Sequence, residues 1–442
     1  MSQYQEPRRD YFKCKVCGWI FQFGTITNFV MCPACVIPGT VILGDNKPIE
    51  NYTDNNHCIG SSSLTTVNHV LERHYCGNMI KVKGLGMLPF IVTSDHPIRV
   101  VQGHGNRISF NSPSWKDAQS LKPKHSCKDG DYLLIPRLEG NTLISSIDLS
   151  PFTSSHGLFV TRAKHYPTSL FLNNQVAWLM GLYVAEGYAH KEEELHFCLN
   201  FNEIDLQSRL LQISQEMGYK ARIQKCSTSA VVCIPSRLLS RAFRMWFGKG
   251  ATNKQIPDFI LFHKDIEILK SFLDGYVAGD GFIDHDHDNR GLKHYRIRCT
   301  TASLVLAQQL QLAYARLGLF ASIKSSMRTS GVVLGRQVIN RMRYDVNVVC
   351  NPAQTKRTVK IFDKYLFVPL AKVEKIPYNG LVYNLQTIDN TFLISNAITH
   401  NCGARDLRPK KADKMDWIDW QRKMKRISTW QHRYWNPHTT DL

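Results

Sequence analysis

Two stretches of the chain share one order of apolar, small and acidic positions. Residues 178–187 read Trp-Leu-Met-Gly-Leu-Tyr-Val-Ala-Glu-Gly, and residues 272–281 read Phe-Leu-Asp-Gly-Tyr-Val-Ala-Gly-Asp-Gly. In each, small residues stand four positions apart, so on a helix they share a face and let a second helix approach closely. An acid and then a glycine follow, and the glycine is expected to end the helix. The repeat therefore predicts two helices packed face to face.

Other patterns predict further elements. Residues 36–43 are typical of an apolar strand with a turn inside it, and residues 90–92 of a strand that runs into an irregular turn. Residues 306–317 have helical apolar spacing before a capping glycine. At 442 residues and 43% hydrophobic content, the chain is long enough for two or three packed domains.

The charge is strongly basic, with 55 Lys and Arg against 36 Asp and Glu and a formal net charge of +19. This balance favours a polyanionic partner, although it does not separate DNA from RNA or an acidic membrane. Residues 294–298 and 336–343 alternate basic and apolar positions, so one strand face could follow phosphates and read bases. A solvated sheet face is the alternative.

The sequence carries no signal for export or membrane insertion. It has no cationic start leading to an apolar stretch and a small-residue cleavage site, and no run of 18 apolar residues. The 13 cysteines, an odd number, are then best interpreted as metal ligands, nucleophiles or buried thiols. We expect the reducing cytoplasm of a cell, with a microbial or viral host.

The cysteines near the start form an interrupted zinc site. Two Cys-x-x-Cys pairs have the spacing of four thiolates around one tetrahedral Zn²⁺: Cys14, Cys17, Cys32 and Cys35. After the second pair, however, the chain continues as a strand, and the expected continuation Cys-Gly-Ala occurs only at residues 402–404. Removing residues 35–401 would restore the site with Cys402 in place of Cys35. Alternatively, Cys35 is the fourth ligand of an ordinary domain fused to an enzyme.

Residues at both ends of this segment suit self-excision. Cys35 can attack the carbonyl of Ala34 to form a thioester, and Cys402 can capture the acyl group. Asn401 can cyclise onto its own carbonyl and break the second peptide bond, with His400 as acid and base. The product would join Ala34 to Cys402 in a 75-residue protein, small enough that a metal would help it fold.

The upstream junction needs an acid for the leaving nitrogen and a donor for the oxyanion. Residues 93–96 supply Thr93 as donor and His96 as acid, with Asp95 in the same turn. With Cys35 at the start and Thr-His-Asn-Cys at 399–402, this set resembles an intein. The last strands, 381–394, match that family's closing block, with Asn384 and Asn390 where the family often has Asp and His.

The intein resemblance implies an all-β, horseshoe-shaped Hint domain assembled from residues 35–155 and 360–401, which needs no cofactor for splicing. It also implies a monomeric intein between two host pieces, residues 1–34 and 402–442. The second piece completes the zinc ribbon and continues as a basic, Trp-rich helix. Its tryptophans suit either nucleic-acid stacking or helix packing.

The two matched helices imply a second activity. Packed face to face, they place Glu186 and Asp280 side by side, which is costly unless a divalent cation lies between them. Two carboxylates sharing Mg²⁺ near a pseudo-two-fold axis suit hydrolysis of both strands of a duplex. The stretches resemble LAGLIDADG homing-endonuclease motifs, with Glu186 in place of the usual Asp. The resemblance adds Lys254 as an accessory lysine, and Lys324 as a weak candidate for a second.

These inferences predict a multidomain chain in which an α+β LAGLIDADG endonuclease, residues 165–350, splits the Hint domain. The endonuclease is expected to be an ααββ-type pseudo-two-fold repeat that cuts double-stranded DNA of the intein-free host gene. A zinc-ribbon nucleic-acid-binding protein fused to a nuclease without self-processing remains an alternative. Autoprocessing that cleaves without ligation is a third, against which the position of Cys402 argues.

Overall fold

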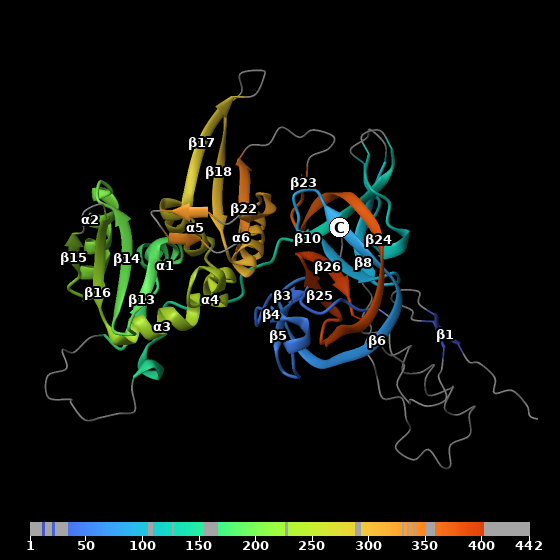
Figure 1. The fold of residues 1–442 in the computed structure, drawn as a ribbon, viewed down its shortest axis with the longest axis horizontal. Helices are drawn as coiled ribbons and strands as arrows, with labels where there is room; N and C mark the ends of the chain where they lie inside the picture. Colours follow the sequence, from blue (N-terminus) through green and yellow to red (C-terminus); the bar gives the residue numbers. More distant parts are fainter. Residues whose placement is uncertain are drawn as a thin grey trace, which may run out of the picture.

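The computed structural model describes residues 11–13, 20–22, 34–104, 109–125, 128–153, 167–225, 229–287, 293–328, 331–333, 336–338, 341–350 and 359–401. Within these residues the chain forms two units that lie side by side (Figure 1). One unit consists almost entirely of strands and is built from the two ends of the described chain. The other combines helices with two four-stranded sheets and comes from the middle.

The strand unit is organised by two very long strands, β6 and β24, which pair antiparallel over most of their lengths. Register shifts between Leu370 and Lys372 and between Gln386 and Thr387 bend this ribbon, and the curved ribbon closes the sheet toward a barrel. The sheet runs in the order β25-β26-β8-β10-β24-β6-β5. Its strands are β5 His57–Ile59, β6 Leu64–Gly84, β7 Phe90–Thr93, β8 Pro97–Gly103, β9 Ser114–Asp117, β10 Gly130–Pro136, β23 Lys360–Ile361, β24 Tyr365–Thr387, β25 Thr391–Ile394 and β26 Ala397–His400.

Shorter elements complete this unit and its borders. Residue Val36 forms single bridges to β7 and β24, which fixes the start of the described segment inside the sheet. The two-stranded pairs are β1 Tyr11–Lys13 with β2 Ile20–Gln22, β3 Val41–Ile42 with β4 Lys47–Pro48, and β11 Ser146–Asp148 with β12 Ser169–Phe171. The 3-10 turns are η1 Ile49–Asn51, η2 Ala118–Ser120, η3 Ser150–Phe152 and η5 Ala251–Asn253.

The mixed unit is built from two halves with the same order of elements. Each half runs helix, two strands, helix, two strands, and its sheet has the order first, second, fourth, third strand. The first half contains α1 Asn174–Glu186, β13 Gly187–His190, β14 Glu194–Asn200, α2 Ile204–Glu216, β15 Arg222–Lys225, β16 Ser229–Pro235 and α3 Arg237–Phe247. The second contains α5 Ile266–Asp280, β17 Gly281–His287, β18 Lys293–Thr301, α6 Leu304–Arg316, β19 Ala321–Arg328 and β22 Arg341–Cys350. A short helix, α4 Asp258–Leu261, lies between the halves, and β20 Gly331–Val333 with β21 Arg336–Val338 forms a hairpin in the second.

This order refines the expected repeat. Each half is αββαββ rather than ααββ, because a strand follows each of the two matched helices directly. Gly187 and Gly281 end those helices with φ near −98°, so they are not left-handed caps. They are required for close approach instead: a Cβ would lie 2.7 Å from the Tyr183 Cα at Gly187 and 2.6 Å from the Val277 Cα at Gly281.

The two units are joined by buried amide side chains. Asn396, in the tight turn between β25 and β26, donates to the Gln308 carbonyl and to Gln311 Oε1 of helix α6, at 2.9 Å each. Gln311 in turn donates to the Gly86 carbonyl of the strand unit. Helix α6 is therefore held against the strand unit by side chains that have little access to water. No helix among the described residues is long and apolar enough to cross a membrane.

Candidate active sites

Helices α1 and α5 meet backbone to backbone at the centre of the mixed unit. A Cβ built on Gly181 would lie 1.9 Å from the Phe272 carbonyl oxygen, and one built on Gly275 would lie 1.9 Å from the Trp178 carbonyl oxygen. Only glycine permits this approach on either side. The sequence-predicted pairing of the two helices is therefore present, and both helices end at the same level with an acid.

Glu186 and Asp280 are the last residues of the two helices. They lie close enough that the charge of Glu186 affects the pKa of Asp280 and the charge of Lys254 affects the pKa of both. Desolvation first, and then the charge of Glu186, raises the pKa of Asp280 to about 7 although its side chain opens to a cavity. Desolvation also raises the pKa of Glu186, followed by the charge of Glu203. The ammonium of Lys254 opposes both shifts. Two carboxylates this close call for a cation.

Lys254 is buried beneath the two acids. Its Nζ donates to the carbonyls of Tyr183 and Gly187 at 2.9 and 2.8 Å and lies 4.2 Å from the Tyr183 ring centroid. Desolvation lowers its pKa to about 8, while Asp280 and Glu186 hold it up. The lysine thus links the end of α1 to the carboxylate pair. Lys324 of β19, by contrast, is the register partner of Asp345 of β22. It is not among the described residues that line the cavity.

The acids open into a cavity of about 710 Å³. The lining combines the two acids with basic side chains and includes Glu186, Asp280, Lys254, Lys191, Arg244 and Lys249. Mg²⁺ prefers carboxylate oxygens and keeps several waters or substrate phosphates as its other ligands. Glu186 and Asp280 provide two such carboxylates facing open space, so the donor set fits Mg²⁺.

The basic strand runs are less available than their sequence indicates. Arg298 of β18 contacts Asp284 across the sheet at 2.5 Å, and Arg343 of β22 contacts Asp345 at 2.7 Å. These ion pairs are exposed and therefore weak. They leave the arginines on the polar face of the second sheet, where a phosphate could replace the carboxylate.

The second candidate site surrounds Cys35. Its side chain is 2% exposed, and its Sγ accepts from Arg73 Nε at 3.3 Å. Burial raises the pKa of the Cys35 thiol, and the charge of Arg73 opposes that rise. The backbone on both sides is clamped: Val36 exchanges two hydrogen bonds with Tyr383, and the Cys35 carbonyl accepts from the Thr93 amide. The predicted scissile bond between Ala34 and Cys35 is thus fixed inside the sheet.

Thr93, Asp95 and His96 all lie against this bond. The sequence predicts Thr93 as a donor to the carbonyl oxygen; its hydroxyl oxygen instead accepts from the Cys35 amide at 2.9 Å. The Thr93 side chain is also hydrogen-bonded to Asp95, whose pKa is raised by burial. His96 is fully buried near the Cys35 backbone, and burial followed by the charge of His400 lowers its pKa to about 3.

His400 and Asn401 lie in the same cluster. Asn401 is fully buried. Its backbone N–H donates to the Asn390 carbonyl at 3.0 Å, and its side-chain Nδ2 donates to Thr387 Oγ1 at 2.9 Å. The His400 ring packs edge-on against Trp115, and burial lowers its pKa to about 4. Strand β26 ends at His400, one residue before Asn401, and pairs with β8, which begins one residue after His96. Both predicted junctions therefore meet near one histidine.

Several contacts in this cluster had no sequence signal. Arg73 and Thr387 come from the long strands β6 and β24, and Trp115 from β9, with spacings that mark no motif. Asn384, on β24, is buried and its Oδ1 accepts from the Leu385 amide. The remaining predicted residues lie outside the described part of the chain: Cys14, Cys17, Cys32 and Cys402.

A family model described as a LAGLIDADG-like domain matches residues 267–345. The match runs from helix α5 to strand β22, and therefore covers the helix that carries Asp280 and the sheet that follows it. This part of the chain is a LAGLIDADG-like domain.

Three similar proteins illustrate the range of matches. The ATP-dependent DNA helicase Hel308 of Thermococcus kodakarensis is 27% identical over 88% of this chain and 38% of its own length. An iron-sulfur cluster assembly SufBD family protein of Mycobacterium tuberculosis is 26% identical over 86% of this chain and 44% of its own. The chain thus spans less than half of either relative. The homing endonuclease I-DmoI, solved with DNA and Mn, shares 15% identity over 40% of this chain and 89% of its own, with a TM-score of 0.26.

Proposed function

We propose that the chain is a self-splicing element that also carries a DNA endonuclease. The observation that carries the splicing proposal is the meeting of two distant junctions. Cys35 and Asn401 are separated by almost the whole described chain, yet both are buried in one strand cluster, each beside a histidine. An ordinary fusion would have no reason to bring these residues together.

At the first junction, Cys35 Sγ attacks the Ala34 carbonyl carbon, and the bond from that carbon to the Cys35 nitrogen breaks. The acyl group moves to sulfur, and the thiol proton passes to the nitrogen, which becomes an amine. The Thr93 oxygen holds the N–H of the leaving nitrogen. His96, neutral because burial lowers its pKa to about 3, has one N–H and one lone pair with which to relay the proton.

At the second junction, Cys402 takes the acyl group from Cys35, and Asn401 then cyclises. Its Nδ2 attacks the Asn401 carbonyl carbon, the peptide bond to Cys402 breaks, and a succinimide remains. Thr387 orients Nδ2, and the neutral His400 can take its proton. The freed Cys402 amine finally captures the acyl group from its own sulfur, which leaves an Ala34–Cys402 peptide bond.

The comparisons support an inserted element. A helicase and an iron-sulfur assembly protein have unrelated named roles. The similarity to each of them covers most of this chain but less than half of the relative. A shared host function would not produce that distribution, whereas an element inserted into unrelated hosts would.

The mass of the purified chain tests splicing. Expression is expected to yield a ligated 75-residue product and an excised 367-residue fragment. Changing Asn401→Ala together with Cys402→Ala should abolish ligation, while Asn379→Ala, an exposed asparagine on β24, should not. An unchanged full-length chain under reducing, chelated conditions would overturn the proposal and favour a permanent fusion of a zinc ribbon to a nuclease. Separate fragments without the ligated product would indicate cleavage alone.

The endonuclease proposal rests on the paired helices and their acids. Glu186 and Asp280 would hold Mg²⁺, which supplies charge neutralisation and an activated water for phosphodiester hydrolysis. Lys254 is placed to steady that water or the phosphate, and the basic side chains that line the cavity suit a polyanion. The substrate we propose is double-stranded DNA encoding the uninterrupted 75-residue host.

Cleavage of that DNA with Mg²⁺ tests this activity independently of splicing. Glu186→Gln and Asp280→Asn should each abolish cleavage, and Asp274→Asn, an exposed acid on the same helix as Asp280, should leave it intact. Cleavage that survives both substitutions, or that proceeds equally in chelator, would sink the proposal. The splicing assay on the same variants shows whether the strand unit still works.

A further inference from the structure

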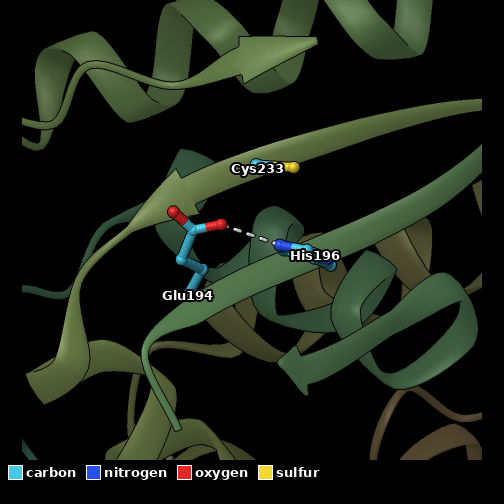
Figure 2. Close-up of side chains that lie close together, drawn as sticks. All are labelled: Glu194, His196 and Cys233. Carbon is cyan, nitrogen blue, oxygen red and sulfur yellow. Dashed lines mark hydrogen bonds and ion pairs between the residues drawn. The ribbon is translucent and has the colours of Figure 1, made fainter. Parts of the chain in front are cut away.

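Three potential metal ligands converge on the first sheet of the mixed unit, outside both candidate active sites. Figure 2 shows Glu194, His196 and Cys233 close together, with the Glu194 carboxylate reaching the His196 ring. Glu194 and His196 are two residues apart on β14, so they share a face of the sheet. Cys233 of the neighbouring strand β16 is the register partner of His196. The strand pairing itself therefore assembles the cluster.

The geometry points to a Zn²⁺ site formed by Glu194, His196 and Cys233, with the fourth position open to water. The ligand atoms all lie within 4.8 Å of one another, and Glu194 Oε2 is 2.9 Å from His196 Nε2. In a tetrahedral zinc site such ligand atoms are about 3.4 Å apart, given metal–ligand bonds of about 2.0–2.3 Å. Small side-chain rotations suffice to admit the ion.

The donor set selects zinc over magnesium or calcium. An imidazole nitrogen and a thiolate sulfur are borderline and soft ligands, whereas Mg²⁺ and Ca²⁺ prefer oxygen alone. A thiolate and a carboxylate would neutralise the charge of Zn²⁺. His196 and Cys233 are 5% and 0% exposed, and their burial favours an ion that is largely stripped of water.

Neighbouring side chains already support the ligands from outside. Arg222 donates to both oxygens of Glu194 at 2.8 Å, which fixes the carboxylate while leaving lone pairs for a metal. The Tyr188 hydroxyl is 3.0 Å from His196 Nδ1, and the His190 ring stacks on the His196 ring at 4.5 Å. Zinc-binding histidines are commonly oriented through their other ring nitrogen in this way.

Binding has a definite proton balance. Without metal, a His196 ring with its single proton on Nε2 would donate to Glu194 and accept from Tyr188 at Nδ1. With metal, Nε2 turns its lone pair to the ion, and the ring proton moves to Nδ1, where it is donated to Tyr188. The Cys233 thiol releases one proton to solvent. The ion would then connect β14 to β16 through side chains, next to Tyr188, which also lines the endonuclease cavity.

Cobalt spectroscopy on the full chain tests the site. The background carries Cys14→Ser, Cys17→Ser, Cys32→Ser, Cys35→Ala and Asn401→Ala, which removes the predicted N-terminal zinc ligands and prevents self-processing. Titration with Co²⁺ should give tetrahedral visible bands and a thiolate-to-cobalt charge-transfer band at one equivalent. Co²⁺ held only by Glu186 and Asp280 gives no thiolate band, so the two sites are distinguishable.

Substitutions then assign the ligands. Cys233→Ser should remove the charge-transfer band, and His196→Gln should weaken cobalt binding at least ~10-fold while keeping a hydrogen-bonding side chain. Cys299→Ser, at another buried cysteine, on β18 of the second sheet, should leave the band unchanged. The proposal is overturned by a folded background without the band, by a band that persists in folded Cys233→Ser, or by unaltered affinity in His196→Gln. Circular dichroism establishes folding in each case.

Discussion

The close approach of the α5 backbone to Gly181 makes Gly181→Ala a sharp test of the helix pair. The added Cβ would lie 1.9 Å from the Phe272 carbonyl oxygen and 2.8 Å from the Tyr276 nitrogen. Because a carbon–oxygen contact normally needs about 3.3 Å, α1 and α5 must separate by roughly 1.4 Å. Alanine contributes about 1 kcal/mol in helix propensity, but overpacking costs about 1–3 kcal/mol or more. The steric effect is expected to exceed the propensity effect.

The expected net loss is roughly 2 kcal/mol, or about 4–8 °C in the melting temperature of a unit this size. The same displacement moves Glu186 away from Asp280, and a misplacement near 1 Å can slow a reaction about 100-fold. Melting temperature, hydrogen exchange in α1 and α5, and DNA cleavage would be measured in a chain carrying Cys35→Ala and Asn401→Ala. Asp274→Ala, on the exposed face of α5, is the control for helix propensity. A higher melting temperature with full cleavage in Gly181→Ala would refute the close packing.

Three further predictions address other contacts. Lys254→Met should abolish DNA cleavage without unfolding the chain, whereas Lys249→Met, at another lysine that lines the cavity, should cause only a small loss of cleavage. Equal losses of cleavage in the two variants would mean that Lys254 has no specific role. Asp258 has a pKa raised from 3.8 to about 6 by desolvation and by Asp45, so its contribution to stability is present below pH 3.8 and lost as pH rises through about 6. Asp258→Asn should therefore raise the free energy of unfolding by about 1–2 kcal/mol near pH 7.5 and hardly at all near pH 4. Equal shifts of the melting temperature at the two pH values would contradict the raised pKa of Asp258. Asn396→Gly keeps the φ of +68° accessible but removes two hydrogen bonds to α6. It should slow splicing about 10-fold in a time course of product formation. An unchanged rate would mean that α6 does not position β26.

Much of the helix pair could be predicted from the sequence because its causes are local. Small residues four apart, followed by an acid, place Gly181 and Glu186 on one helix and Gly275 and Asp280 on its partner. Periodicity fixes which residues share a helix face whatever surrounds them. The reason for the following glycines differed from the predicted one, because close approach to the preceding turn, rather than a left-handed φ, excludes a side chain at Gly187.

The residues proposed for the two junctions follow from the sequence as a set, but their surroundings were decided by tertiary structure. Cys35 and Asn401 could be named from their order along the chain, whereas Arg73 and Thr387 became their partners only because β6 and β24 pair over most of their lengths. The same holds for Cys233, which meets His196 through strand register alone. Sequence determines which chemical groups the chain carries and which local face each occupies. Long-range pairing determines which of them meet, because contacts between distant residues depend on register, burial and closure of the whole sheet.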